Sequence, residues 1–271
     1  MTIPVFQKKV WAYYKKHGRH DLPWRKTKDP YKILVSEVML QQTQVARVIP
    51  KYEAFLKAFP NVQALAKASP QAVLKLWSGL GYNRRALYLK RAAEAVAREY
   101  KGVFPKEAEE LEKLGGIGPY TARAVATFSH DMPYVCIETN IRTVFLHEFY
   151  PKSKDVSDKK LIPLIEQSLP KKQFRQWYWA LMDYGTYLKK SIPNPSRASA
   201  HHTKQSTFEG SVRQMRGYIV REVSRSSKTS TALKNVLPKK DHVRFDTALT
   251  GLVRDGLVVQ TKTGRVTISK H

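Results

Sequence analysis

Two glutamates in this sequence have surroundings suited to different kinds of carboxyl chemistry. On a helix, the first of them, Glu37, shares a face with the apolar residues Ile33 and Leu34. A carboxyl group among apolar neighbours is costly to ionise, so burial favours the protonated form that a general acid needs near neutral pH. Glu37 is therefore a candidate proton donor. The alternative is a buried carboxylate that caps a nearby helix.

The second glutamate, Glu138, follows a glycine-rich turn and a helix. The turn, residues 114–118, reads LGGIG, and Pro119 after it is typical of a first helical position. Glycine lets a backbone approach another molecule closely, and the N–H groups at a helix start favour a phosphate. We therefore expect Gly116 and Gly118 to contact a nucleic-acid backbone while Glu138 faces the sugar of one displaced nucleotide. A tight corner between two helices with a purely structural role is the alternative.

Two further stretches carry side chains that could enter a duplex. The glutamines that follow Glu37 are Gln41, Gln42 and Gln44. Such a cluster can probe or replace a base. The stretch GLGYNRR places Tyr82 at the tip of a turn beside Arg84 and Arg85. We expect the ring to wedge into a base step and the arginines to bind phosphates. Ordinary packing of the Tyr82 ring is the alternative.

The charge of the chain indicates a polyanionic partner. Its 271 residues carry a net charge of +26, and the pI is about 10.1. Residues 1–200 contain 34 Lys and Arg against 17 Asp and Glu, and residues 201–271 contain 14 against 5. A fold does not require this excess, whereas a nucleic-acid partner explains it. A ribosome-like or generally basic protein is the alternative.

The composition disfavours metal, disulfide and membrane chemistry. One thiol, that of Cys136, cannot form an internal disulfide, a four-cysteine zinc site or an iron–sulfur cluster. His201 and His202 have no second ligand pair nearby in sequence, so we expect no metal and no cofactor. The N-terminus lacks a signal-peptide pattern, and no apolar run is long enough to span a membrane. We expect a cytoplasmic, prokaryotic-type protein associated with the nucleoid.

The elements that position these residues are predicted to be helices. Short helical patterns with short connections predict an all-α fold over residues 1–190, with a break near Pro50 and no strand before residue 250. Residues 191–210 read as a polar linker or surface strap. Residues 211–271 show three helical patterns and a hairpin around residues 262–264, an arrangement similar to a winged helix. This basic module could add DNA contacts or serve only for docking.

Together these motifs resemble the helix–hairpin–helix (HhH-GPD) DNA glycosylases and, within them, the adenine DNA glycosylases of the MutY type. The matching segments follow the family order and are LPWR (22–25), SEVMLQQTQ (36–44), LWSGLGY (76–82), LGGIGPYTA (114–122), ETN (138–140) and ALMD (180–183). The family implies an all-α, two-lobed fold that binds a DNA duplex and flips one nucleotide between its lobes.

The resemblance also implies roles for single residues. Glu37 would protonate the departing adenine, and Glu138 matches the family's catalytic aspartate, which stabilises the cationic sugar and the incoming water. Tyr120 and Asn140 match residues that position the sugar and that carboxylate. Because a lysine nucleophile is absent at position 120, covalent amine chemistry is not expected. The other matches are the adenine-pocket wall (Trp24, Arg25, Asp183) and the groups inserted into the base stack (Gln42, Tyr82).

Three departures separate this sequence from the family pattern. The four cysteines that hold the family's iron–sulfur cluster are missing, and residues 189–207 take their place. The catalytic aspartate is replaced by Glu138, which is one methylene longer, and a misplaced carboxylate can lower a rate by roughly a hundredfold. The family's larger C-terminal domain, which reads 8-oxoguanine, is replaced by residues 211–271, and this weakens the case for 8-oxoguanine as the opposite base.

The leading hypothesis is a monomeric, monofunctional glycosylase that excises adenine opposite 8-oxoguanine or guanine in double-stranded DNA. The second is a glycosylase for uracil or thymine in guanine mispairs, or for another damaged base. The third is a non-catalytic DNA-binding protein on the same scaffold. The expected domains are residues 1–190 (a glycosylase domain with two interleaved lobes), 191–210 (a linker) and 211–271 (a winged-helix-like module).

Overall fold

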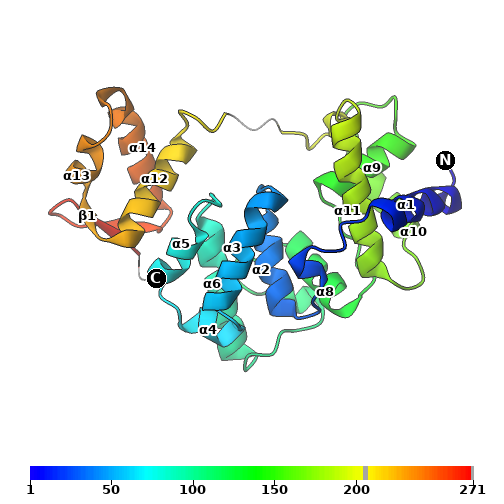
Figure 1. Cartoon of the computed structure of the whole chain (residues 1–271), viewed down its shortest axis with the longest axis horizontal. Coiled ribbons are helices and arrows are strands. Elements are labelled where there is room, and N and C mark those ends of the chain that lie inside the picture. Colours follow the sequence, from blue (N-terminus) through cyan, green and yellow to red (C-terminus); the bar gives the residue numbers. More distant parts are fainter. Residues whose placement is uncertain (204–206, 270–271) are drawn as a thin grey trace. The chain divides into compact units, whose positions relative to one another are not determined.

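The protein is mostly helical, and its chain divides into two compact units built from interleaved segments (Figure 1). The computed structural model describes residues 1–203 and 207–269. Of these, unit 1 contains residues 1–33, 106–112 and 118–203, and unit 2 contains residues 34–105, 113–117 and 207–269. Among the described residues, no helix combines the length and the apolar character that crossing a membrane requires. The expected all-α class with a small C-terminal hairpin is confirmed.

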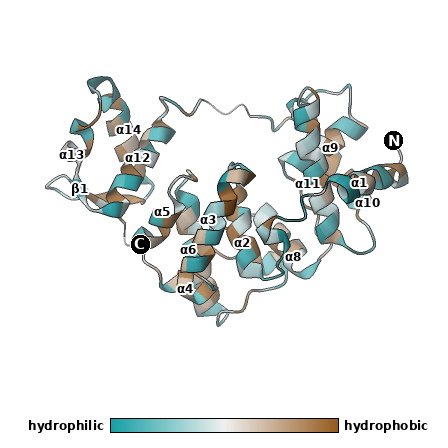
Figure 2. Cartoon of the chain, in the orientation of Figure 1, coloured by the Kyte–Doolittle hydropathy of each residue, from teal (hydrophilic) through white to brown (hydrophobic). Residues whose placement is uncertain are grey.

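Unit 1 packs its helices around a cluster of aromatic rings. Its elements are α1 (Ile3–His17), η1 (Pro23–Arg25), α7 (Ala108–Glu112), α8 (Pro119–His130), α9 (Thr139–Phe149), α10 (Asp158–Gln167), α11 (Phe174–Ser191) and η2 (Pro195–Ala198). The buried ring of Phe6 in α1 lies 5.8 Å from Trp177 in α11 and 5.1 Å from Phe145 in α9, between ring centroids. Figure 2 shows hydrophobic and hydrophilic residues mixed along the helices, as expected for helices that bury part of their surface.

Unit 2 joins the middle of the chain to its C-terminal region. Its elements are the end of α2 (Pro30–Leu40), α3 (Val45–Ala58), α4 (Val62–Lys67), α5 (Pro70–Trp77), α6 (Arg84–Glu99), α12 (Val212–Arg225), β1 (Lys228–Thr229), α13 (Ser230–Asn235), η3 (Lys239–Asp241), α14 (His242–Arg254), β2 (Val258–Gln260) and β3 (Arg265–Ile268). Phe55 and Trp77 pack edge to face in its core, with centroids 6.2 Å apart. Helix α12 packs on α5, and Gln71 Nε2 donates to the Ser224 carbonyl oxygen at 3.0 Å.

The helix break predicted near Pro50 is wrong, because the break lies at residues 41–44. Helix α2 ends at Leu40, and α3 runs through Pro50 without interruption. Proline removes one helical hydrogen bond, which here leaves the carbonyl of Ala46 without its usual donor. Both Ala46 and Pro50 are exposed, so water can satisfy that carbonyl and the helix continues.

The C-terminal module contains the three helices and the hairpin that were predicted, together with one strand that was not. The short strand β1 pairs antiparallel with β3, so the strand order in the sheet is β1-β3-β2. The prediction of no strand before residue 250 is therefore wrong. A strand of two residues, Lys228 and Thr229, is too short to show the alternation by which strands are found in a sequence.

Candidate active site and nucleic-acid interface

Glu37 lies in the second half of α2, in a part of the helix that is buried on all sides. Every residue from 33 to 39 is buried, and Glu37 itself is 9% exposed. The apolar surroundings that the sequence predicted for this carboxyl group are present. Burial of this kind disfavours the charged form of a carboxyl group and favours the acid.

Arg85 of α6 holds together the two turns that follow α2 and α5. Its Nη1 donates to the carbonyl oxygen of Val38 at 2.7 Å and also to that of Gln41. Its Nη2 donates to the carbonyls of Leu80 and Gly81 at 3.2 and 3.1 Å. Carbonyls at a helix end lack helical partners, and Arg85 supplies them at the end of α2. Burial lowers the pKa of Arg85 to about 10, so the guanidinium stays charged at neutral pH.

The two turns present Gln42 and Tyr82 in a left-handed backbone conformation, with φ of 53° and 46°. This conformation costs roughly 1–3 kcal/mol for a residue with a side chain and persists where the surroundings enforce it. The contacts of Arg85 enforce it here, so we assign Arg85 to holding the turns, and its guanidinium is occupied by the protein. Arg84 and Gln44 are exposed and stay candidates for phosphate contacts, as does Gln42 for the base stack.

The glycine turn between α7 and α8 contains one glycine that the fold requires and one that it does not. Gly116 has a φ of 89°, and a Cβ there would lie 2.5 Å from Tyr88 Cβ. Gly118 is the N-cap of α8 with an ordinary φ of −87°, and a Cβ there would meet no atom within 4 Å. Open space beside this backbone suits the close approach of a partner to the start of α8, whose first turn carries the half-buried Tyr120.

Glu138 is the N-cap of α9, and both of its carboxylate oxygens accept hydrogen bonds. Oε1 accepts from the backbone N–H of Asn140 at 2.8 Å and of Ile141 at 2.9 Å, and Oε2 accepts from Asn140 Nδ2 at 3.1 Å. These bonds fix the carboxylate at the positive end of the helix dipole. Lys189 of α11 lies within its electrostatic reach. Burial lowers the pKa of Lys189, and the charge of Glu138 partly opposes that shift.

Gly185 in α11 allows this helix to approach the start of α9. A Cβ on Gly185 would lie 2.2 Å from the carbonyl oxygen of Asn140. Such a contact is impossible without moving one of the two backbones. Since Asn140 also holds the carboxylate of Glu138, the glycine sets the position of the candidate catalytic group. Sequence reasoning missed this residue, although a glycine inside a long helix is a signal of close approach.

Gly185→Ala is expected to destabilise the protein by about 1–3 kcal/mol, because an added methyl overpacks the contact with α9. Urea unfolding followed by circular dichroism measures the change. The matched control is Gly217→Ala in α12, where a Cβ would meet no atom within 4 Å. Alanine is a better helix former than glycine by about 0.5–1 kcal/mol, so the control should be neutral or stabilised. Equal effects of the two changes would contradict this account.

The predicted pocket residues Arg25 and Asp183 form a buried ion pair. Arg25 Nη1 lies 2.8 Å from Asp183 Oδ2, and Arg19 Nη2 lies 2.6 Å from Asp183 Oδ1. The Arg25 guanidinium also lies 5.3 Å from the ring centroid of Trp179, and Trp24 beside it in the chain is buried. Burial alone would raise the pKa of Asp183, but hydrogen bonds from Arg25 and Arg19 outweigh it and hold the pKa below its usual value.

Asp183→Asn is expected to destabilise the protein by about 3–5 kcal/mol, because the buried guanidinium of Arg25 loses the charge that compensates its burial. The pH dependence has a definite sign. A carboxyl group with a lowered folded-state pKa contributes its full stability above its unfolded pKa of about 4, and loses it as pH falls further. Denaturant unfolding from pH 7 to pH 3 measures both effects.

The matched control for this change is Asp246→Asn, which breaks the more exposed ion pair between Asp246 and Lys234. An exposed pair contributes about 0–1 kcal/mol, so this variant should unfold almost as the parent protein does. An Asp183→Asn protein as stable as the control would show that the buried pair is not a stabilising element.

A family model covers much of the site described above. Residues 35–171 match the model of the HhH-GPD superfamily base excision DNA repair protein. The chain belongs to this superfamily. The expected helix–hairpin–helix DNA glycosylase is thereby confirmed, and the protein is a DNA-binding enzyme of base excision repair.

Individual relatives extend the similarity of this HhH-GPD glycosylase to most of its length. An adenine DNA glycosylase of Mycolicibacterium smegmatis is 34% identical, in a match that takes in 93% of this chain and 92% of the relative. One from Mycobacterium tuberculosis (strain CDC 1551 / Oshkosh) is 32% identical, over 94% of this chain and 90% of the relative. Among solved structures, a thermostable thymine-DNA glycosylase is 25% identical with a TM-score of 0.62, covering 71% of this chain and 90% of its own.

The residues of this HhH-GPD protein do not fit the iron–sulfur cluster that the family pattern implies. A four-cysteine cluster needs four thiolates, and the chain has only Cys136, which is fully buried. Across residues 1–203 and 207–269, no group of three or more His, Cys, Asp or Glu side chains could hold a metal ion. His201 lies 3.8 Å from Asp158, whose carboxylate is already held by Arg142 at 2.7 Å.

The described part of the segment in place of the cluster, residues 192–203, is bonded to the rest of unit 1. Its short helix η2 is capped by Asn194, whose Oδ1 accepts from the Ser196 backbone N–H at 3.0 Å. The Val156 N–H donates to the Ala198 carbonyl at 2.8 Å, and the Ala200 N–H donates to the Val156 carbonyl at 3.1 Å. These bonds attach the segment to the loop before α10, and η2 also packs on α9.

Proposed function

We propose that this glycosylase removes adenine from mispairs with guanine or 8-oxoguanine in double-stranded DNA. The observation that carries the proposal is the buried carboxyl group of Glu37, at the proton-donor position of the family motif. The 34% identity to an adenine DNA glycosylase over 93% of this chain supports adenine as the base.

In the proposed reaction, Glu37 donates a proton to the adenine as the bond between the base and C1′ of the sugar breaks. The bonding electron pair leaves with the base, which the proton turns into a better leaving group. The sugar then carries a developing positive charge, and the fixed carboxylate of Glu138 stabilises it. Water adds its oxygen to C1′ and releases a proton, which leaves an abasic site.

The other predicted residues support these two acids. We propose that Tyr120 and Asn140 position the sugar and the carboxylate of Glu138, and that Asn140 does so partly through its bond to Oε2. Arg25 and Asp183, held rigidly by their ion pair, and the buried Trp24 would form the wall of the adenine pocket. With Tyr120 in place of a lysine, the enzyme is monofunctional and leaves the DNA strand intact.

The proposed DNA contacts come from the exposed parts of the turns. Gly116 and Gly118 would hold the backbone of the bound strand, while Gln41, Gln42, Gln44, Tyr82 and Arg84 would meet the duplex around the mispair. We propose that the enzyme works as a monomer on cytoplasmic nucleoid DNA and without a cofactor. The proposed domains are residues 1–190, 191–210 and 211–271.

A second candidate function is the removal of thymine or uracil opposite guanine. It is favoured by the similarity to the thymine-DNA glycosylase, at 25% identity and a TM-score of 0.62. A glutamate at position 138, where the family pattern has an aspartate, also distinguishes this chain from the pattern of adenine glycosylases.

The free base that the protein releases separates the two candidates. Purified full-length protein is incubated with duplexes that carry adenine opposite guanine, 8-oxoguanine or cytosine, and uracil or thymine opposite guanine. Mass spectrometry identifies the released base. We expect adenine from the guanine or 8-oxoguanine mispairs, with strand cleavage only after alkali. Release of only thymine or uracil would support the second candidate, and no free base from any duplex would contradict both.

A further inference from the structure

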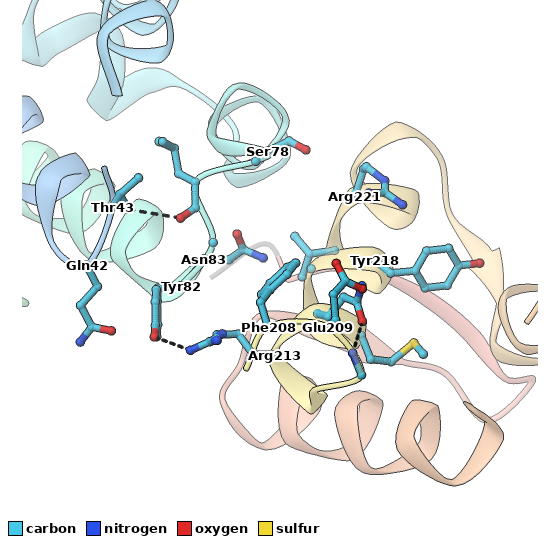
Figure 3. A pocket seen from close by; sticks show the side chains of 18 of the residues that line it. Gln42, Thr43, Ser78, Tyr82, Asn83, Phe208, Glu209, Arg213, Tyr218 and Arg221 are labelled. Carbon is cyan, nitrogen blue, oxygen red and sulfur yellow. Dashed lines mark hydrogen bonds between the residues drawn. The ribbon is translucent and has the colours of Figure 1, made fainter. Parts of the chain in front are cut away.

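In unit 2, the side chains of Gln42, Tyr82 and Arg213 line two neighbouring recesses. The larger recess has a volume of about 970 Å³ and continues along α12 (Figure 3). The smaller, of about 510 Å³, extends to Tyr88 and Leu252. A molecule bound in either recess can therefore contact these three side chains.

Tyr82 is joined to Arg213 through its hydroxyl group. Arg213 Nη1 donates to Tyr82 Oη at 3.0 Å, and Figure 3 shows the two side chains pointing toward each other. The guanidinium of Arg213 lies 5.7 Å from the Tyr82 ring centroid, and that of Arg85 lies 5.5 Å from it. Arg85 fixes the turn that carries Tyr82 through its bonds to the carbonyls of Leu80 and Gly81. The Tyr82 ring and the Arg213 guanidinium therefore lie side by side at the recesses.

Arg213 reaches this position because the sequence starts a helix just before it. Ser211 caps α12, accepting from the Gln214 backbone N–H at 3.1 Å, and Arg213 lies in the first turn. Its guanidinium also lies 5.6 Å from the ring centroid of Phe208. The rings of Tyr82 and Phe208 and the Ser211 cap therefore orient the Arg213 guanidinium. Its two parallel N–H groups can bind a planar edge that carries two acceptors.

The larger recess carries an excess of positive charge. Its cationic side chains are those of Arg47, Arg213, Arg221, Lys240 and Arg244. Of its two acids, Asp241 is paired with Arg244 at 2.9 Å, and Glu209 accepts from Gln214 Nε2 at 2.7 Å. The remaining charge is complementary to a DNA strand.

We propose that Arg213 recognises the base opposite the excised one, and that this base is a guanine. The inference rests on the proposed function, in which Tyr82 meets the duplex at the mispair, and on the expectation from the sequence that its ring enters the base stack there. If the Tyr82 ring enters the stack, Arg213 comes close to the base that stays in the duplex opposite the flipped nucleotide. That base then replaces the Tyr82 hydroxyl as the hydrogen-bond partner of the Arg213 guanidinium. The two N–H groups of the arginine fork match O6 and N7 of guanine, the commonest specific arginine–base contact.

The test compares guanine with 7-deazaguanine, which lacks only the N7 acceptor. Each is placed opposite a tetrahydrofuran abasic analogue in otherwise identical duplexes, and full-length protein is titrated by fluorescence anisotropy. The parent protein should bind the guanine duplex about five- to tenfold more tightly, as expected for half of a bidentate contact. Arg213→Gln should bind both duplexes equally. Arg213→Lys keeps the charge without the fork, so it should keep much of the affinity and lose most of the preference.

Arg221→Ala is the matched control, because Arg221 lines the same recess from the same helix. Loss of one cationic side chain from the recess should weaken binding to both duplexes by the same factor and leave the preference intact. Equal binding of guanine and 7-deazaguanine by the parent protein would overturn the proposal, as would an undiminished preference in Arg213→Lys or in a folded Arg213→Gln protein. The abasic analogue has no base to excise, so failure of adenine release and failure of this proposal are separate outcomes.

Discussion

Glu37→Gln is expected to slow base release by about 10²–10⁴-fold, the usual contribution of a positioned general acid. Glutamine has nearly the same shape as glutamic acid but cannot donate a proton to a departing base. Affinity for DNA should change little, because Glu37 contributes no charge to the exposed turns.

Single-turnover release of adenine from a mispair duplex measures the effect, and anisotropy on the abasic-analogue duplex checks binding. Glu53→Gln is the matched control, an exposed glutamate on α3 of the same unit, and should react at the parent rate. A Glu37→Gln protein that releases adenine within a factor of three of the control would remove Glu37 from the reaction.

The second large effect is expected at the cap of α9. Glu138→Gln removes the negative charge that stabilises the sugar cation, and loss of one such electrostatic group costs about 10²–10³-fold in rate. The amide oxygen of glutamine can still accept the N–H bonds of Asn140 and Ile141, so the loss in stability should stay below about 1 kcal/mol. The rate and the stability are therefore expected to change independently.

Two further variants make this prediction specific. Glu138→Asp keeps both the charge and a strong N-cap residue, so its rate should stay far above that of Glu138→Gln. Glu166→Gln on α10 removes an exposed carboxylate from the same unit and should have no effect on the rate. Equal rates for Glu138→Gln and Glu138→Asp would mean that the charge at this position does not act in the reaction.

Much of this site was predictable because its residues lie in local patterns. The apolar neighbours of Glu37 follow from helical spacing, and they are present in α2. The sequence also places Glu138 directly before a helix, although only the structure shows that its carboxylate caps the helix with three hydrogen bonds.

Contacts between distant parts of the chain were not predictable. The sequence places Arg85 beside Tyr82 and indicates a phosphate contact, whereas its guanidinium binds carbonyls at the end of α2, more than forty residues earlier. Gly185 and Asn140 lie on different helices, with the starts of α10 and α11 between them in the sequence. The only sign in the sequence that α11 approaches α9 closely is a single glycine inside a helix. The contact of Arg213 with Tyr82 joins residues 131 positions apart, and nothing in the local sequence of α12 indicates it.

The helix break and the short strand illustrate the same limit. Pro50 indicated a helix break at the wrong place. The effect of a proline depends on whether water can reach the carbonyl one turn earlier, here that of Ala46, and the sequence does not show this. Strand β1 exists because β3 offers it a partner, and two residues contain no pattern of their own.

A double-variant cycle tests most directly whether Glu37 and Glu138 act on the same transition state. Single-turnover rates of adenine release are measured for the parent protein, Glu37→Gln, Glu138→Gln and the doubly substituted protein. Groups that act as one unit show strongly non-additive losses, so the double variant should be little slower than the slower single variant. Losses that multiply in full would mean that the two acids contribute independently. A single variant that keeps the parent rate would contradict the two-acid mechanism.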